Sequence, residues 1–143
     1  MPIRTVITRR SNHFRVSVSS LKNGHPTPCE SILEGMMARF LEVSPLVKSY
    51  EVQPSHEFLM VQGEKYRYTP DFIVRLINGS EAWVEVKPAE CLLVHHIAAL
   101  INAAKQHFQS SGRCFHVVTD EWLMAEPRAG NIEKLMYHRR GLM

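Results

Sequence analysis

The sequence predicts an α/β domain in which a mixed β-sheet lies between helices. Residues 68–74 and 83–87 are rich in β-branched and aromatic side chains, and the Asn78-Gly79 pair between them is typical of a hairpin turn. Apolar residues recur at helical spacing before this hairpin and again after it. Residues 114–118, which follow the second helical segment, are expected to form a further strand, so helices and strands alternate along the chain.

Length and composition indicate one globular domain. The 143 residues can bury a substantial core, and the hydrophobic share of 45% and the charged share of 22% are typical of folded proteins. No apolar run reaches the length of a membrane span, and the chain does not open with a signal peptide. The three cysteines are odd in number and lack CxxC spacing, so we expect a protein of the reducing cytoplasm.

The N-terminal segment is basic. Residues 1–22 alternate loosely between apolar and polar side chains, which predicts a basic arm or hairpin ahead of a single domain at 23–143. No acid occurs before Glu30, and such clustered positive charge favours phosphate contacts, with a solvated basic tail as an equal alternative. The basic residues of this segment are Arg4, Arg9, Arg10, Arg15 and Lys22.

A helix is expected to begin near residue 27. Thr27 can serve as its N-cap, Pro28 suits the first helical position, and Glu30 can close a capping box. Glu34 then has no structural role and lies at the margin of the buried face, where an unpaired carboxylate is costly. If a third acid completes an active site, the candidate is therefore Glu34 and not Glu30. The apolar stripe of this helix comprises Leu33, Met36, Met37, Phe40 and Leu41.

The other elements follow from the same periodicities. Gln53-Pro54 ends a strand, because proline cannot donate to a β-ladder, and Thr119 can cap a short helix. The expected elements are strands at 47–52 and 58–61, a helix with apolar residues from 93 to 108, a buried strand at 114–118 and a last amphipathic helix at 131–140.

The central hairpin carries two acids and an amine within segments whose apolar character predicts burial. Burying Asp71, Glu85 and Lys87 is costly unless they are paired or bind a metal. The plain alternative is an ordinary Glu85–Lys87 pair on one strand face, with Asp71 starting its strand after a turn. A strict two-residue turn would pair Asp71 with Val86 and place it on the face opposite Glu85. A shared site therefore requires a three-residue loop, a bulge or a bend at Pro70.

Other catalytic patterns do not occur in the sequence. His95-His96 lack the HExxH spacing of zinc hydrolases, so we expect no histidine metal site. No GxGxxG or phosphate-loop pattern is present, which argues against nucleotide-driven chemistry. The charged groups of the central hairpin are therefore the leading candidates for chemistry.

Pro70-Asp71, followed on the next strand by Glu85-Val86-Lys87, matches the PD-(D/E)xK nuclease signature. The chain resembles the N-terminal nuclease domain of TnsA, the endonuclease subunit of heteromeric transposases. The resemblance implies a restriction-endonuclease-like fold and hydrolysis of phosphodiester bonds in double-stranded DNA with Mg²⁺, or with Mn²⁺ in its place. The resembling stretches are residues 30–34, 50–54, 68–72, 84–88, 115–120 and 131–135.

The resemblance also assigns a role to each matching position. Hard oxygen ligands suit Mg²⁺, and a lysine two residues from a ligand shares its strand face, where it can hold a water or stabilise developing charge. The implied metal ligands are Asp71, Glu85, Glu34 and the carbonyl of Val86, the implied catalytic residues are Glu34, Asp71, Glu85 and Lys87, and Gln53 would lie beside the site.

The leading functional hypothesis is an endonuclease that acts with partner proteins in DNA transposition or recombination and is encoded by a bacterium, phage or mobile element. A free-standing phage-type (head-completion) or repair nuclease is the alternative enzyme, and a non-catalytic DNA-binding or assembly protein on the same fold is the alternative of another class. The sequence has no helix-turn-helix or zinc-finger pattern for reading bases. We expect phosphate contacts from Arg4, Arg9, Arg10, Arg15, Lys22, Lys105, Arg139 and Arg140.

Overall fold

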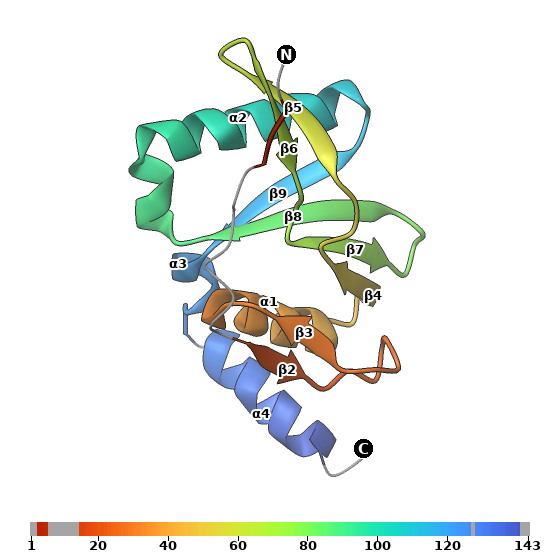
Figure 1. The fold of residues 1–143 in the computed structure, drawn as a ribbon. Coiled ribbons are helices and arrows are strands. Elements are labelled where there is room, and N and C mark those ends of the chain that lie inside the picture. Colours follow the sequence, from red (N-terminus) through yellow and green to blue (C-terminus); the bar gives the residue numbers. More distant parts are fainter. Residues whose placement is uncertain (1–2, 6–14, 127, 141–143) are drawn as a thin grey trace.

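The computed structural model describes residues 3–5, 15–126 and 128–140, and its centre is a four-stranded sheet (Figure 1). The strands lie in the order β4 (Val47–Val52), β7 (Phe72–Leu76), β8 (Glu81–Lys87) and β9 (Cys114–Thr119). β7 runs antiparallel to both β4 and β8, whereas β9 is parallel to β8. A mixed sheet flanked by helices confirms the predicted α/β fold class.

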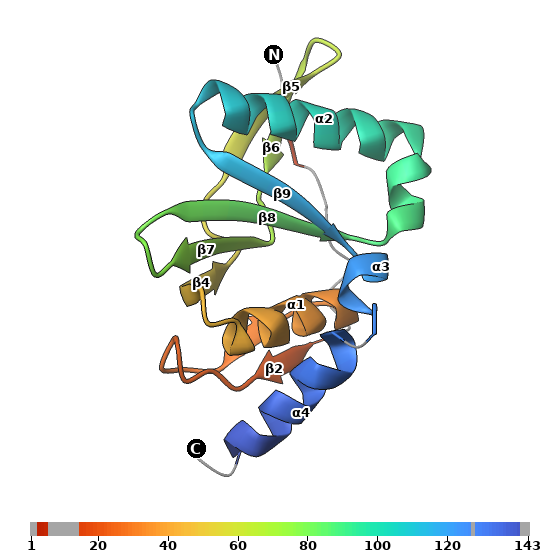
Figure 2. The same cartoon turned by 180° about the vertical axis from the view of Figure 1, so that it is seen from behind.

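Helices lie on both sides of the central sheet (Figure 2). Side chains alternate between the two faces along each strand, so Phe72 and Val84 pack into the main core with α1 (Ile32–Val43). Trp83, one residue before Val84, joins the opposite cluster with Phe108 of α2 (His95–Ser110). Charged side chains of β8 that lie two or four residues from Trp83 therefore share its face, on the α2 side of the sheet.

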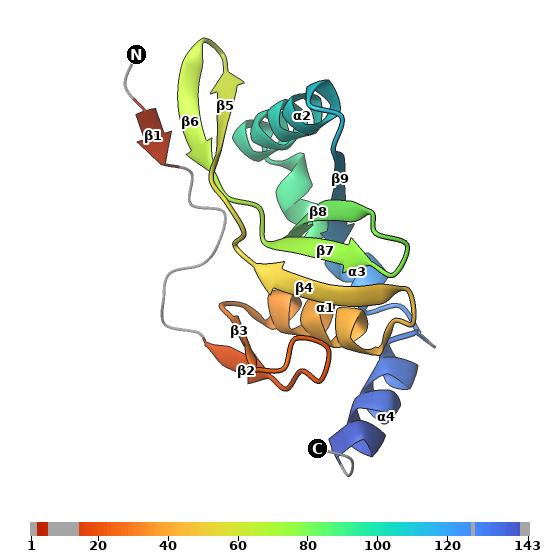
Figure 3. The same ribbon diagram turned by 90° about the vertical axis from the view of Figure 1, so that its right-hand side faces the viewer.

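A second sheet packs against α2. β5 (Glu57–Val61) and β6 (Glu64–Tyr68) form an antiparallel hairpin, and β1 (Ile3–Thr5) pairs in parallel with β6. One face of the hairpin is buried against α2, as at Leu59, and the other is exposed, as at Met60. Figure 3 shows this hairpin extending away from the central sheet.

A further hairpin, β2 (Val16–Val18) and β3 (Thr27–Cys29), packs against α1. Val18 and Cys29 are buried in the main core, so the boundary predicted at residue 22 falls inside this hairpin. Arg9 and Arg10 of the predicted basic arm lie outside the described residues.

The predicted start of the first helix is wrong. Thr27 pairs with Val18 in the β2–β3 hairpin, and the N-cap of α1 is Ser31, whose Oγ accepts a hydrogen bond from Glu34 N at 3.0 Å. Pairing with β2 buries Thr27 and Cys29 and outweighs the capping pattern. The N-cap is therefore Ser31 rather than Thr27, with Glu34 rather than Glu30 at the third helical position.

The elements after β8 are helical apart from β9. A 3₁₀ turn, η1 (Ala89–Leu93), leads into α2, and α3 (Asp120–Leu123) begins after the predicted cap Thr119, whose Oγ1 accepts a hydrogen bond from Trp122 N at 3.4 Å. α4 (Arg128–Arg140) packs against α1. None of the helices in the described part of the chain is both long and apolar enough to cross a membrane.

The strand at 114–118 is present, but the prediction that it is buried is wrong. β9 lies at the edge of the central sheet, and Cys114 and His116 are exposed. The apolar composition of this stretch reflects its inward positions, such as Phe115, which packs with Phe108 of α2 at a ring-centroid distance of 4.9 Å.

Glu42 joins the end of α1 to the residues between β2 and β3. Its side chain is buried, and its carboxylate accepts hydrogen bonds from Ser20 Oγ at 2.6 Å, Tyr50 Oη at 2.7 Å and Leu21 N at 3.0 Å. Each donor is partly or fully buried, so each depends on this carboxylate for a partner.

Lys22 caps the same end of the helix. Its Nζ donates to the carbonyl of Leu41 at 2.7 Å and to the carbonyl of Ser44. These carbonyls belong to the last turn, where a helix leaves them without intrahelical partners. Lys22 thus stabilises the C-terminal end of α1. Because its ammonium is engaged there, we do not assign this predicted phosphate contact to a DNA surface.

Replacing Glu42 with alanine is expected to lower the free energy of unfolding by about 3 kcal/mol, because several buried donors lose their acceptor together. The matched control is Glu51→Ala, which removes an exposed partner of Arg75 and should cost less than about 1 kcal/mol. Urea denaturation of both variants measures the difference. Equal losses would show that the Glu42 network contributes no more than a surface ion pair.

Candidate active site

The loop between β7 and β8 sets the register that the proposed site requires. Phe72 pairs with Val84, and the ladder continues so that Leu76 and Ser80 enclose a three-residue loop closed by a hydrogen bond from Leu76 N to Ser80 O at 2.9 Å. Gly79 ends this loop with φ at +90°, a conformation that favours glycine. The turn is therefore not the strict two-residue turn that would separate the acids.

One step beyond the Phe72–Val84 pair, this register places Asp71 across from Glu85 on the same face. Asp71 lies in the short break between β6 and β7, after the buried Pro70. Its backbone carbonyl accepts a hydrogen bond from Gln53 N at 2.9 Å. Gln53 is thus beside the site, and its φ of +49° marks the bend that ends β4.

The Asp71 side chain is only partly satisfied. Its residue is 2% exposed, its Oδ2 accepts a hydrogen bond from Val86 N at 2.8 Å, and its Oδ1 has no hydrogen-bond partner among the described residues. Burial, followed by the negative charges of Glu85 and Glu34, raises the pKa of Asp71 well above its ordinary value. A buried carboxylate with one open oxygen is suited to receive a cation.

Glu85 has the same arrangement from the neighbouring strand. It is fully buried, and Tyr68 Oη donates to its Oε1 at 2.5 Å. Its Oε2 lies 3.7 Å from Lys87 Nζ and has no hydrogen-bond partner within the described ranges. Burial raises the pKa of Glu85 to about 7, although the hydrogen bond from Tyr68 and the charge of Lys87 oppose the shift.

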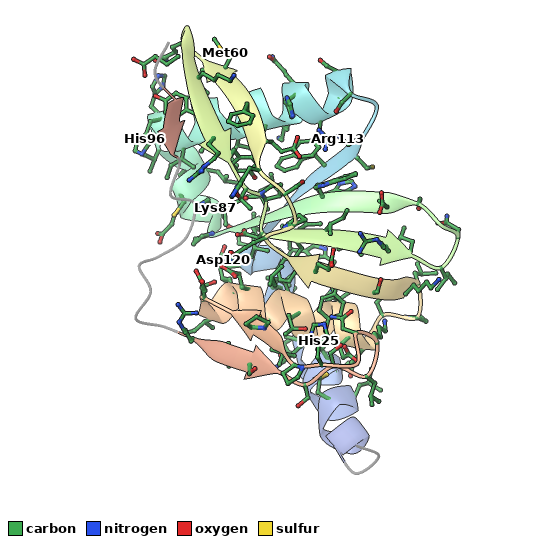
Figure 4. All side chains as sticks on the ribbon, turned by 45° about the vertical axis from the view of Figure 1, so that its right-hand side comes forward. His25, Met60, Lys87, His96, Arg113 and Asp120 are labelled. Atoms are coloured by element: carbon green, nitrogen blue, oxygen red, sulfur yellow. The ribbon has the colours of Figure 1, made fainter. Side chains whose placement is uncertain are left out.

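Lys87 extends from the same face of β8 as Glu85, two residues further along the strand (Figure 4). Its side chain is 13% exposed, so the ammonium lies where the buried acids approach the surface. The turn after it is anchored, because Ala89 N donates to Asp120 Oδ1 at 2.7 Å. Asp120 thereby ties the end of β8 to the start of α3.

Glu34 lies near these groups but serves the helix that carries it. Its residue is 3% exposed, and its Oε1 accepts a hydrogen bond from Glu30 N at 3.3 Å, while its backbone N–H donates to Ser31 Oγ. The predicted capping role of Glu30 is therefore wrong: Glu34 occupies the third position of α1, and Glu30 lies 3.8 Å from Arg15. The negative charge of Glu34 still contributes to the raised pKa of Asp71.

The structure thus brings Asp71, Glu85 and Lys87 together and places Glu34 at their margin. In the part of the chain that the structure describes, no three His, Cys, Asp or Glu side chains converge closely enough to hold a metal by themselves. Two open carboxylate oxygens and the nearby backbone of Val86 nevertheless form an all-oxygen donor set. Such donors fit Mg²⁺ or Mn²⁺, which keep several water ligands.

Tyr68 is the site residue that sequence reasoning missed. It is fully buried on β6 and orients Glu85 through its hydroxyl, so that Oε2 rather than Oε1 stays open. A signal was present in the sequence, because a buried tyrosine almost always needs a partner for its hydroxyl and Tyr68 directly precedes the Thr69-Pro70-Asp71 break.

The residues predicted to grip phosphates are scattered. Lys105 is exposed on α2, Arg15 lies near Glu30, and Lys22 caps α1. Arg4 belongs to β1, and Arg139 and Arg140 belong to the end of α4, but the positions of these three side chains are not described. The described members of this set do not form one basic surface.

A mixed sheet flanked by helices, with paired buried carboxylates and a lysine at the end of its central hairpin, defines the restriction-endonuclease-like class of folds. The family model described as TnsA-like endonuclease N terminal matches residues 44–120, more than half of the chain. The chain belongs to this family, as the resemblance predicted. The matched segment contains Gln53, Asp71, Glu85 and Lys87, whereas Glu34 precedes it. A search of curated proteins found no match.

The raised pKa of Glu85 predicts how stability depends on pH without metal. An unfolded glutamate titrates near 4.5 and Glu85 near 7, so the folded protein loses stability as the pH rises from about 5 through 7. Glu85→Gln should remove the contribution of this residue and be more stable than the wild type at pH 8 by about 3 kcal/mol, with little difference at pH 5.

Thermal melting in EDTA across this pH range measures the effect. Glu81→Gln is the matched control, because Glu81 lies on the same strand but is exposed and paired with Arg75. A wild type at least as stable as Glu85→Gln at pH 8 would contradict the proposed cost of burying this carboxylate.

Proposed function

We propose that this protein is a metal-dependent endodeoxyribonuclease that hydrolyses phosphodiester bonds in double-stranded DNA. The observation that carries the proposal is the juxtaposition of Asp71 and Glu85, each buried with one open oxygen, beside the Lys87 ammonium. Asp71 Oδ1 and Glu85 Oε2 would hold Mg²⁺ or Mn²⁺ with the carbonyl of Val86. Glu34, near the N-terminal end of α1, would be a further ligand of this metal.

A phosphodiester carries a negative charge that repels hydroxide, so hydrolysis requires that this charge be neutralised and that a water be activated. A bound Mg²⁺ would supply Lewis acidity and lower the pKa of a water at the site. The two carboxylates orient the site, since Val86 N–H fixes Asp71 and Tyr68 fixes Glu85. Lys87 can hold the attacking water or donate to the phosphate oxygen where charge develops. Lysine suits both tasks because, unlike arginine, it can also release a proton.

The burial of these groups favours catalysis over a purely structural role. Two facing carboxylates with one nearby ammonium leave an excess of negative charge in a buried site, which is costly in a protein that never binds a cation there. A non-catalytic DNA-binding or assembly protein has no need to maintain this arrangement. A free-standing phage-type or repair nuclease would use the same chemistry.

We further propose that the enzyme acts with partner proteins in DNA transposition or recombination. Membership of the TnsA-like endonuclease family supports this context. The sequence also lacks a helix-turn-helix or zinc-finger pattern that would read base edges, so a partner would supply target choice.

Asp71→Ala, Glu85→Ala and Lys87→Ala are each expected to reduce nicking of supercoiled plasmid by at least about 100-fold, because each removes a metal ligand or the catalytic amine. Nicking is measured with Mg²⁺, with Mn²⁺, and with Ca²⁺ as a cation that supports binding without cleavage. Arg75→Ala, on the exposed half of β7, is the control and should retain activity. Undiminished nicking by any two of the three site variants would exclude this assignment.

Tyr68→Phe is expected to weaken metal binding by about tenfold, because Glu85 loses the hydrogen bond that orients it. Nicking at saturating Mg²⁺ should remain close to that of the wild type. Titration calorimetry with Mn²⁺ measures the affinity directly. Tyr66→Phe is the matched control, since Tyr66 lies on the same strand and donates to Glu64 instead. Unchanged Mn²⁺ affinity in Tyr68→Phe would mean that Tyr68 does not position Glu85.

A further inference from the structure

The β5–β6 hairpin has one face that α2 does not cover. The covered face carries Leu59 and Tyr68, which pack with Phe108 of α2. The hairpin lies in front of α2 in Figure 1 and behind it in Figure 2, so its uncovered face is turned away from the helix. The exposed residues on the uncovered face, here called the outer hairpin face, are His56, Phe58, Met60 and Arg67, with the half-buried Lys65 among them.

The outer hairpin face combines apolar and basic side chains without a carboxylate from either strand. Phe58 and Met60 are 45% and 56% exposed, which is high for large apolar residues. The two acids of these strands, Glu57 and Glu64, have the parity of the covered face, and Glu57 is held there by Arg113 at 2.6 Å. The charge of the outer face is therefore positive.

The register of the hairpin places the cations beside the apolar residues. Phe58 pairs with Arg67 and Met60 with Lys65, so the four side chains form one block across the two strands. Lys65 Nζ lies 4.8 Å from the centre of the Phe58 ring, which holds the ammonium over the aromatic face. Basic groups with interleaved apolar side chains suit a nucleic-acid backbone, where the cations bind phosphate and the apolar groups meet the groove.

The outer hairpin face also lies close to the candidate active site along the chain. Tyr68, the last residue of β6, contacts Glu85 from the covered face, and Asp71 follows three residues later. Arg67 precedes Asp71 by four residues, a path of at most about 14 Å in extended chain. Because phosphates on one DNA strand rise about 3.4 Å each along the helix axis, a duplex cut at Asp71 would bring phosphates only a few base pairs away within reach of Arg67 and Lys65.

We propose that the outer hairpin face binds the backbone of the DNA duplex that flanks the cleaved bond. This inference rests on the proposed function and adds to it a binding surface that none of the predicted phosphate contacts includes. Lys65 and Arg67 contact phosphates, and Phe58 and Met60 pack in the adjoining groove. Figure 4 shows Met60 toward the far end of the hairpin and Lys87 below its base, so the surface leads away from the cleavage site along one direction.

The test measures binding of a fluorescent duplex by anisotropy, in Ca²⁺, between about 50 and 200 mM salt. A double variant, Lys65→Ala with Arg67→Ala, should reduce the salt-dependent slope of log affinity by about 1.8, since each phosphate contact contributes about 0.9. The fall in affinity over this salt range then becomes about tenfold smaller. A second double variant, Phe58→Ala with Met60→Ala, should weaken binding without changing the slope.

Lys48→Ala with Arg75→Ala is the control, because it removes the same net charge from β4 and β7, away from the outer hairpin face. Its slope should equal that of the wild type. If both hairpin double variants have the same slope and affinity as the wild type, the proposal is overturned. This is the result expected if the face binds a protein instead of DNA. If the wild type nicks plasmid DNA in that case, the proposed function stands without this binding surface. A wild type that neither binds nor nicks DNA overturns both the proposed function and the proposed surface.

Discussion

The repulsion between two carboxylates buried side by side is the constraint around which this structure is arranged. Asp71 and Glu85 face each other across the central hairpin; burial raises the pKa of both, and the negative charge of Glu85 raises that of Asp71 further. The surrounding groups, Val86 N–H, Tyr68 and Lys87, satisfy only part of each carboxylate. The remaining negative potential is a cost in the isolated protein and would favour the binding of the divalent cation that we propose for this site.

Several features of the fold serve this juxtaposition. The three-residue loop at 77–79 fixes the register, and the break at Pro70 allows β6 to leave the central sheet while Tyr68 stays within reach of Glu85. Gln53 N anchors the backbone of Asp71 from the end of β4. The site is thus assembled from three consecutive strands and the loops that join them. This local origin explains how a short motif in the sequence could indicate it.

Much of the fold could be predicted because its strands and helices repeat with clear periods. The bounds of β4 and the cap at Thr119 depend on neighbouring residues alone. The helix start could not be predicted, because Thr27–Glu30 and Ser31–Glu34 both satisfy a capping box and only pairing with β2 decides between them. The exposure of β9 and the hydroxyl partner of Tyr68 likewise depend on contacts between residues far apart in the sequence.

The anchoring of α1 has a mechanical consequence. Lys22 binds the carbonyls of Leu41 and Ser44, and Ser20 binds Glu42, so the C-terminal end of the helix is tied to the residues between β2 and β3. Glu34 lies near the other end of the same rigid helix, about 10 Å away along its axis. Because a helix moves as a unit, a displacement of its tied end would also change the distance of Glu34 from the paired carboxylates.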